Sequence, residues 1–361
     1  MSYILDIQTA VPQHKHSQSA FVNFLSNATN DNSIKRKINI VAKKAGIDER
    51  YSVLKDYSAS PNNFTFYEKS VDLLPQPTLT KRMDAFHQEA LPLSLKAIKK
   101  IKNFSSVKNK ITHIITVTCT GLFAPGLDID LIHALKLNPS INRSSINFMG
   151  CNAAILALKN ADSICKSDKN ATVLIVCTEL CTLHFQKNYS DDYLLSNLLF
   201  GDGAAAVIVS GKKSSNNKNV LKINSFHSLI INKGYTDMAW HPSETGFLMN
   251  LTSYVSLLIK ENIKAMIAGL KINPKKINHW AVHPGGKKIV DDFFEVLGLD
   301  SNKAKHSYAV LRNYGNMSSP TVLFVLKDMI QKNKSAKKGE SVFAAAFGPG
   351  LSIETMQASY A

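Results

Sequence analysis

The second half of the chain repeats elements of its first half in the same order and at nearly the same spacing. The distance from the first matched element to the second is 40 residues in one copy (111 to 151) and 39 in the other (277 to 316). Agreement over three elements predicts two similar halves that face each other across an approximate two-fold axis. The matched pairs are residues 111–114 (ITHI) with 277–280 (INHW), 150–154 (GCNAA) with 315–319 (GNMSS), and 171–174 (ATVL) with 340–343 (ESVF).

Each half is predicted to have an α/β architecture. Residues 111–117, 172–177 and 204–209 are apolar runs of strand length, typical of strands buried on both faces. Strands alternate with helical patterns, such as residues 82–101 with Pro92 near the middle, and this alternation indicates an α/β fold. The polar stretch 211–219 (GKKSSNNKN) reads as an exposed loop between the copies, so we predict an N-terminal half over residues 1–215 and a C-terminal half over 216–361.

Cys151 follows the turn residue Gly150 and precedes small residues, so it is predicted to lie at the head of a helix. Unpaired N–H groups and the helix dipole at such a position favour a thiolate. A buried, inert core cysteine is an equally reasonable interpretation of this residue alone. By the repeat, Asn316 occupies the equivalent helix head, and each of the two heads is expected to follow a short strand. His283 follows a strand equivalent to the one before Cys119 and Thr120. These groups are expected to converge near the axis.

Bulk properties restrict the class of protein. The net charge of +16 suits an anionic ligand or non-specific nucleic-acid binding, but no nucleic-acid-binding motif accompanies it, so a nucleic-acid partner is not expected. Five cysteines without disulfide-type spacing favour a reducing compartment. Neither a signal peptide nor a membrane span is recognised, and we expect a cytoplasmic protein.

Five motifs together resemble the type III polyketide synthases, the chalcone and stilbene synthase-like group, in their microbial form. The resemblance extends from about residue 3 to residue 354 and implies a thiolase-like fold. That fold has two duplicated αβα halves in a five-layered αβαβα core and forms a homodimer. The motifs are FMGCNAA around Cys151, LFGDGAAA around Phe200, AVHPGG around His283, NYGNMSS around Asn316, and FGPGLSIE over residues 347–354.

The resemblance implies a catalytic set of Cys151, His283 and Asn316. A cysteine thiolate can hold an acyl group as a thioester because it is both nucleophilic and a good leaving group. His283 would pair with that thiolate, and His283 with Asn316 would donate hydrogen bonds to the thioester oxygen during decarboxylation of malonyl-CoA. Decarboxylation drives carbon–carbon bond formation, so no metal and no cofactor beyond the CoA thioester substrates is expected.

The family's cavity and gate positions can also be assigned by resemblance. Phe200 matches a gate between substrate tunnel and cavity, although ordinary core packing would explain a phenylalanine there. Met249 occupies the second gate, where plant enzymes carry an aromatic residue, and a flexible methionine there loosens recognition of aromatic starters. The other positions assigned to the cavity lining are Cys119, Thr120, Cys181, His184, Trp240 and Ser318.

Lys37 and Lys44 match basic residues at the family's tunnel mouth, where CoA phosphates bind. Seven residues apart on a helix, they lie on one face. Ile40 replaces a third basic residue of that set, and exposed lysines on a helix surface are an equally good explanation.

The sequence therefore predicts an acyltransferase that loads an acyl-CoA starter, possibly fatty acyl, on Cys151 and extends it with malonyl-CoA. The intermediate would cyclise to a resorcinol, a pyrone or a related phenol. One alternative is a ketoacyl synthase III-like enzyme that performs a single condensation with an acyl carrier protein. Another is a non-catalytic acyl-binding protein of thiolase fold.

Overall fold

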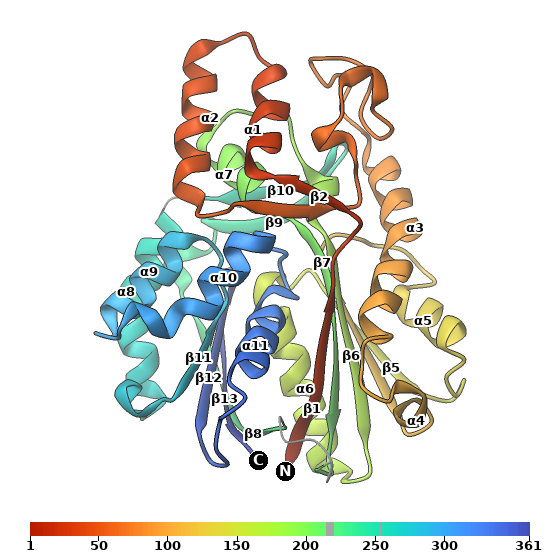
Figure 1. The fold of residues 1–361 in the computed structure, drawn as a ribbon, viewed down its shortest axis with the longest axis vertical. Coiled ribbons are helices and arrows are strands. Elements are labelled where there is room, and N and C mark those ends of the chain that lie inside the picture. The colour runs from red at the N-terminus through yellow and green to blue at the C-terminus, as the bar shows by residue number, and fades with distance from the viewer. Residues whose placement is uncertain (214–219, 253) are drawn as a thin grey trace.

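The computed structural model describes residues 1–213, 220–252 and 254–361, and its core is a nine-stranded mixed sheet (Figure 1). The predicted boundary between residues 215 and 216, and most of the predicted loop 211–219, lie outside the described residues. The strand order is β11-β12-β13-β8-β1-β7-β6-β4-β5. The strands are β1 (Ser2–Ala10), β4 (His113–Thr118), β5 (Asn142–Asn147), β6 (Thr172–Leu180), β7 (Asp202–Ser210), β8 (Leu221–Ile230), β11 (His279–Val282), β12 (Ser341–Gly348) and β13 (Ser352–Tyr360).

The two ends of this sheet have the same topology, as the internal repeat predicts. In the N-terminal half β4 runs parallel to β6, which pairs antiparallel with β7; in the C-terminal half β11 runs parallel to β12, which pairs antiparallel with β13. The matched sequences 111–114 and 277–280 run into β4 and β11, and 171–174 and 340–343 run into β6 and β12. The halves join where β1 pairs with β8 over only three residues, from Ser2 to Ile4.

One part of the repeat prediction is wrong. The stretch before Asn316 was expected to be a strand like the one before Cys151, but it is helix α10 (Lys305–Tyr314). Among the described residues, the sheet of the C-terminal half therefore has no counterpart of β5. The sequence 305–314 has its apolar residues at helical rather than alternating spacing, which explains the difference.

The helices complete five layers. Helices α6 (Ala153–Ser167) and α11 (Thr321–Lys332) lie between the two halves of the sheet and share one hydrophobic cluster with strands of both. Helices α3 (Leu79–Ile98) and α5 (Leu127–Leu135) cover the N-terminal half from outside, and α8 (Tyr254–Gly269) and α9 (Lys287–Val296) cover the C-terminal half. The predicted helix 82–101 is thus α3, with Pro92 inside it. The predicted αβαβα layering is present in the structure.

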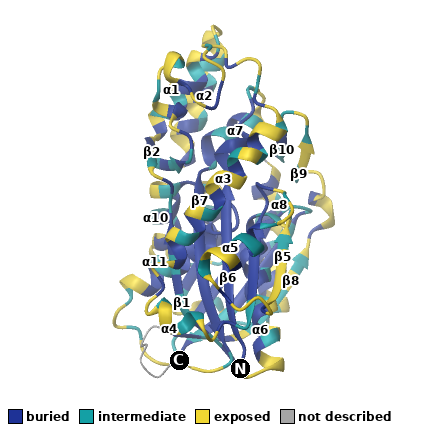
Figure 2. Cartoon of the chain, turned by 90° about the vertical axis from the view of Figure 1, so that its right-hand side faces the viewer, coloured by how far each residue is buried: buried dark blue, intermediate teal, exposed yellow. Residues whose placement is uncertain are grey.

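Strands buried on both faces explain the continuous apolar runs in the sequence. Successive side chains of a strand point to opposite faces. In β6, Val173 and Ile175 pack into the central cluster, whereas Leu174 and Val176 pack into the outer one. Figure 2 shows β6 and β7 dark along their length, and every residue of both strands is buried.

A smaller set of elements sits over one end of the sheet, around the candidate site (Figure 1). Among the described residues, no helix is long and apolar enough to cross a membrane. The set comprises the antiparallel pairs β2 (His14–Ser17) with β3 (Glu49–Ser52) and β9 (Met238–Ser243) with β10 (Gly246–Leu251), and helices α1 (Gln18–Asn27), α2 (Asn32–Ala45) and α7 (Asp191–Leu199). The short helix α4 (Phe104–Lys108) lies outside this set.

The central helices should contribute strongly to stability. Leu323 of α11 is fully buried in the central cluster, so Leu323→Ala is expected to lower the free energy of unfolding by about 2–5 kcal/mol. Urea unfolding followed by circular dichroism measures this change. Leu257→Ala in α8 makes the same truncation at a residue that is 47% exposed, and it should cost well under half as much. Equal losses for the two variants would contradict the layered packing.

Candidate active site

Cys151 lies at a sharp turn between β5 and α6. The backbone has positive φ at Phe148 (57°) and Gly150 (79°), and Cys151 is in a short 3₁₀ turn immediately before α6. A side chain at Gly150 would also place its Cβ 2.0 Å from Cδ of Pro349, in the FGPG segment. Glycine is therefore required there for two reasons, conformation and space. The Gly150 N–H donates to Sγ of Cys119 at 3.0 Å, which fixes the turn from the other side.

Asn316 faces Cys151 with a defined orientation. Its Oδ1 accepts hydrogen bonds from the Ser318 N–H (2.8 Å) and from Oγ1 of Thr321 (3.3 Å). Nδ2 and Oδ1 of the amide lie 3.9 Å and 4.0 Å from Sγ of Cys151. Because the oxygen is occupied, the group offers a donor to the site. The repeat predicts Asn316 at the head of a helix. Helix α11 begins only at Thr321, so Asn316 lies in the turn before that helix.

His283 directly follows β11, and its main-chain N–H donates to the carbonyl of Ala345. Both ring nitrogens are buried and have no hydrogen-bond partner among the described residues. Burial lowers the pKa of His283 to about 3, so the resting imidazole is neutral. A ring whose position is fixed by the backbone, with its own polar atoms unused, can donate a hydrogen bond to a ligand.

His184, a second buried histidine of the cavity, is in a different state. Its Nε2 donates to the carbonyl of Thr120 at 2.8 Å, and its Nδ1 accepts from the Phe247 N–H at 3.0 Å. The ring also stacks on Phe247 at 4.3 Å. With both nitrogens engaged, His184 shapes the cavity wall and has no donor left for a ligand.

The thiolate expected at Cys151 is not favoured in the resting site. Burial raises the pKa of Cys151 to about 11, although hydrogen bonds from Ser318 and Asn316 work in the opposite direction. Cys151 does lie just before α6, as predicted. Desolvation nevertheless raises its pKa by more than the N-terminus of the helix lowers it. A charged Cys151 would therefore need a compensating opposite charge close to its sulfur.

One cavity contains all of the cysteine, histidine, asparagine, gate and lining residues assigned from the sequence. It measures about 950 Å³, including the space open to solvent. Met249 pairs with Trp240 across β9 and β10, and Nε1 of Trp240 donates to the carbonyl of Cys119 at 2.7 Å. The assigned residues on its walls are Cys119, Thr120, Cys151, Cys181, His184, Phe200, Trp240, Met249, His283, Asn316 and Ser318.

Glu179 was not assigned from the sequence. Its carboxylate is fully buried at the end of β6, and Oε1 accepts from Oγ of Ser319 at 2.6 Å. The other oxygen accepts from the Cys119 N–H and from the hydroxyls of Thr118 and Thr120. Burial raises the pKa of Glu179, and these hydrogen bonds counteract the shift. The signal in the sequence was a lone acid in the apolar stretch 172–180.

Lys37 and Lys44 lie on α2, near the cavity but not on its walls. Nζ of Lys37 is 2.5 Å from Oδ1 of Asp191 at the start of α7, and α7 lines the cavity further along. Lys44 is exposed, and none of the ion pairs found among the described residues includes it. Ile40, between them, is 53% exposed.

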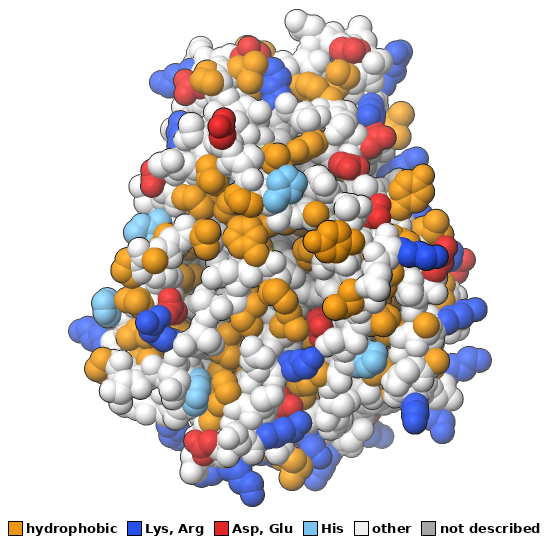
Figure 3. Space-filling view, turned by 180° about the vertical axis from the view of Figure 1, so that it is seen from behind, with side chains coloured by type: hydrophobic (Ala, Val, Ile, Leu, Met, Phe, Trp, Pro, Cys, Tyr) orange, Lys and Arg blue, Asp and Glu red, His pale blue; other side chains and the backbone are white. Residues whose placement is uncertain are grey.

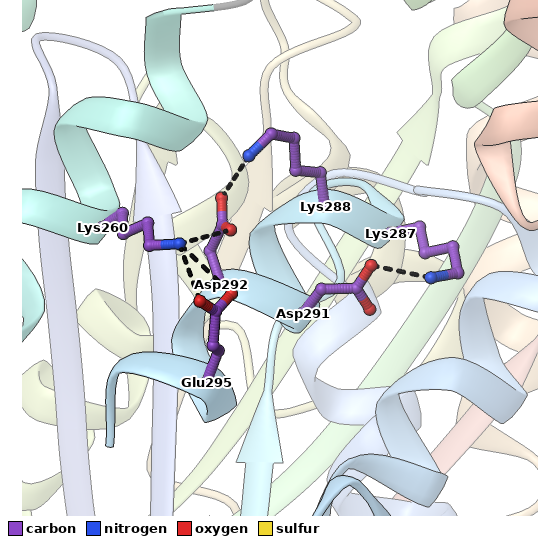
Figure 4. A network of polar contacts seen from close by, with 6 residues as sticks. All are labelled: Lys260, Lys287, Lys288, Asp291, Asp292 and Glu295. Atoms are coloured by element: carbon purple, nitrogen blue, oxygen red, sulfur yellow. Dashed lines mark hydrogen bonds and ion pairs between the residues drawn. The ribbon is translucent and has the colours of Figure 1, made fainter. Parts of the chain in front are cut away.

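The lysines that follow the HPGG motif are paired with acids instead. Figure 4 shows Lys287 with Asp291 and Lys288 with Asp292, each at 2.7 Å along α9. Lys260 of α8 completes the network through Asp292 and Glu295. These lysines carry little uncompensated charge toward an anionic ligand, whereas Lys44 does.

Comparison with known proteins identifies the family. The N-terminal domain of chalcone and stilbene synthases matches residues 1–213, and the C-terminal domain of the same family matches residues 223–359. The chain belongs to this family. The family is that of the type III polyketide synthases, and the chain has their thiolase-like fold, as the sequence resemblance predicted.

Similar proteins come from several sources. "Probable polyketide synthase 1" of Dictyostelium discoideum is 29% identical over 368 residues, which is 98% of this chain but only 11% of that protein. The C-terminal type III domain of "Steely1", a type I/III hybrid from Dictyostelium, superposes with a TM-score of 0.91, 27% identity and 99% coverage of both chains. PKS-I of the brown alga Ectocarpus siliculosus superposes with a TM-score of 0.92 and 26% identity. The match covers 100% of this chain and 98% of the algal chain.

The neutral state of the resting site leads to a prediction about Cys151. Without an imidazole to accept its proton, the thiolate should form only as the pH approaches the raised pKa of about 11. His283→Ala is therefore expected to slow alkylation of Cys151 by iodoacetamide at pH 6.5 by roughly tenfold or more. Mass spectrometry of the Cys151 peptide between pH 5 and 10 measures the rate.

Cys119 and Cys181 provide internal references, because burial raises their pKa values as well. Equal labelling of Cys151 in both proteins would show that His283 does not assist it. Labelling of Cys151 no faster than that of the reference cysteines in the unaltered protein would favour a non-catalytic acyl-binding protein.

Proposed function

We propose that the chain loads an acyl-CoA starter on Cys151 and extends it with malonyl-CoA by decarboxylative Claisen condensation. The main support is that Cys151, His283 and an oriented Asn316 amide face one buried cavity. In the loading step Sγ of Cys151 attacks the thioester carbonyl while His283 takes the thiol proton, and CoA leaves as the thiol. The acyl group is then held as a thioester at the cavity floor.

In the condensation step, malonyl-CoA loses CO₂ and negative charge develops on its thioester oxygen. Two donors placed at that oxygen lower the barrier because they need no reorganisation during the reaction. Nδ2 of Asn316 and Nε2–H of His283 have this role in our proposal. The resulting carbanion attacks the acyl carbonyl on Cys151 and expels the sulfur, which regains a proton. The chain is then one ketide unit longer and can be loaded again.

We propose a fatty acyl starter and cyclisation to a resorcinol, a pyrone or a related phenol. Support for the starter comes from the cavity wall, where Met249 and Trp240 lie side by side and Phe247 packs behind them. These flexible or apolar surfaces offer contact with an alkyl chain. Phe200 has the role of a gate, and Cys119, Thr120, Cys181, His184 and Ser318 shape the space in which the product folds.

Lys37 and Lys44 remain our candidates for the CoA phosphates. Both lie on one side of α2, next to α7, whose residues Tyr193, Ser196 and Asn197 belong to the cavity wall. Lys44 has an uncompensated charge, and Lys37 would have to exchange Asp191 for a phosphate. The carboxylate thus makes Lys37 the weaker of the two candidates.

Cytoplasmic localisation also stays a prediction.

We also propose a homodimer. Strand β5 ends the sheet, and five of its six residues are exposed, so its free edge could pair with another chain. Leu122 and Met149, close in sequence to the site residues Thr120 and Cys151, are exposed by 57% and 47%. The face in Figure 3 also gathers hydrophobic side chains over its middle, with lysine and arginine spread around its edge. Such surfaces are commonly covered by a partner.

Product analysis tests the proposed reaction. Purified protein is incubated with malonyl-CoA and a panel of aromatic, short and long acyl-CoA starters, and the products are identified by mass spectrometry. Products with two or more extensions from long starters support the proposal. Turnover of only short or aromatic starters would refute the fatty acyl starter. Dependence on a carrier protein, with one extension only, would favour the ketoacyl synthase III-like alternative.

The proposed division of roles predicts distinct losses in variants. Asn316→Ala should lower malonyl-CoA decarboxylation by about 10²–10³-fold, because it removes one donor to the developing charge. Acylation of Cys151 by the starter, read by intact mass, should be affected much less. Cys151→Ala should abolish acylation altogether. If Asn316→Ala lost loading and decarboxylation to the same degree, the amide would not have the role proposed.

A further inference from the structure

Tyr57 lies between two hollows of the molecule. On one side it lines the reaction cavity, together with Phe21 and Phe185. On the other side it lines a groove at the surface, together with Phe24 and Phe64. Tyr57 belongs to the short turn Asp56–Ser58, next to α1. A single layer of aromatic rings therefore separates this part of the cavity from the outside.

This layer is rigid at Tyr57. The phenol donates to the carbonyl of Thr182 at 2.6 Å and shares a hydrogen bond with the Tyr67 hydroxyl at 2.9 Å. The ring stacks on Phe21 with centroids 4.3 Å apart, and the guanidinium of Arg50 lies 3.5 Å from the Phe21 centroid. Tyr57 is 2% exposed. A ring held by two hydrogen bonds and by stacking resists displacement by a ligand.

The end of the cavity beside this layer suits an apolar ligand. Its polar side chains are already engaged within the protein: Oγ1 of Thr182 donates to Asp202 at 2.7 Å, and Nδ2 of Asn197 donates to the carbonyl of Gln186 at 2.7 Å. Nε2 of Gln186 donates to the carbonyl of Thr245 at 2.7 Å. A polar group placed here would lose its hydration without gaining partners, whereas an alkyl chain loses nothing.

We propose that Tyr57 is the end wall for the alkyl chain of the starter and thereby limits its length. The inference rests on the proposed function, in which that chain is carried as a thioester on Cys151. The chain extends from the sulfur along the cavity until it meets the Tyr57 ring. Removal of the ring would join the cavity to the surface groove and give room for longer chains.

Self-acylation of Cys151 by a series of saturated acyl-CoA thioesters tests the wall directly, without malonyl-CoA. The rate constant is read by intact mass for each chain length. Tyr57→Ala should shift the preferred length upward, with about a fourfold gain in kcat/KM for each methylene newly buried. Tyr57→Phe keeps the ring and should retain the original preference. Phe21→Leu, a milder change on the cavity side, should shift the preference in the same direction by less.

Tyr67→Ala is the matched control, since Tyr67 belongs to the same aromatic layer but lines neither hollow. It should leave the chain-length preference unchanged at similar cost in melting temperature. An unchanged preference in folded Tyr57→Ala and Phe21→Leu would overturn the proposal, and so would an equal shift in Tyr67→Ala. Failure of every thioester to acylate the unaltered Cys151 would instead overturn the proposed function, and this inference with it.

Discussion

Burial of α6 and α11 between the two halves of the sheet is the constraint on which the site depends. The first halves of both helices, residues 153–158 and 321–326, are buried nearly all round, so each helix contacts strands on two sides there. Packed together in one layer, they bring the turns before them, with Cys151 and Asn316, to the same end of the sheet. The candidate catalytic groups are thus brought to one end of the sheet by the same hydrophobic contacts that stabilise the fold, and local hydrogen bonds then orient them.

The same burial sets the electrostatics of the cavity. Desolvation raises the pKa of Cys151 and Glu179 and lowers that of His283 and Arg50, so an isolated charge is disfavoured at every one of these positions. Glu179 is compensated by hydrogen bonds to both of its oxygens. His283 is left without such compensation, and a ligand is what can supply it. An unpaired buried imidazole costs free energy in the empty site, and a substrate that makes the missing hydrogen bond would recover that free energy.

The architecture and most of the candidate site could be predicted from the sequence, because both follow from patterns that are visible in the order of the residues. Apolar runs specify doubly buried strands, and the repeat related His283 and Asn316 to the first half before any family was considered. Helix α10 was missed because the repeat was assumed to hold in every element. Glu179 was missed because its significance lies in its four donors, which come from the end of β4 and from the turn before α11. Tyr57 was missed because contact with a cavity is a property of packing, and no local pattern marks it.

Two chain segments are hydrogen-bonded to each other beside Phe200, the proposed gate, and this restricts how such a gate could move. Asn316 donates its N–H to the carbonyl of Leu199 at 3.0 Å, and its own carbonyl accepts from the Gly201 N–H at 2.9 Å. The residues on both sides of Phe200 are thus hydrogen-bonded to the backbone of Asn316, whose amide is proposed to act in catalysis. Displacement of the backbone to open the gate would misplace that amide. Opening must therefore occur by rotation of the Phe200 side chain about χ1 and χ2, while the Asn316 amide keeps its position. For unhindered side chains this rotation takes nanoseconds or less.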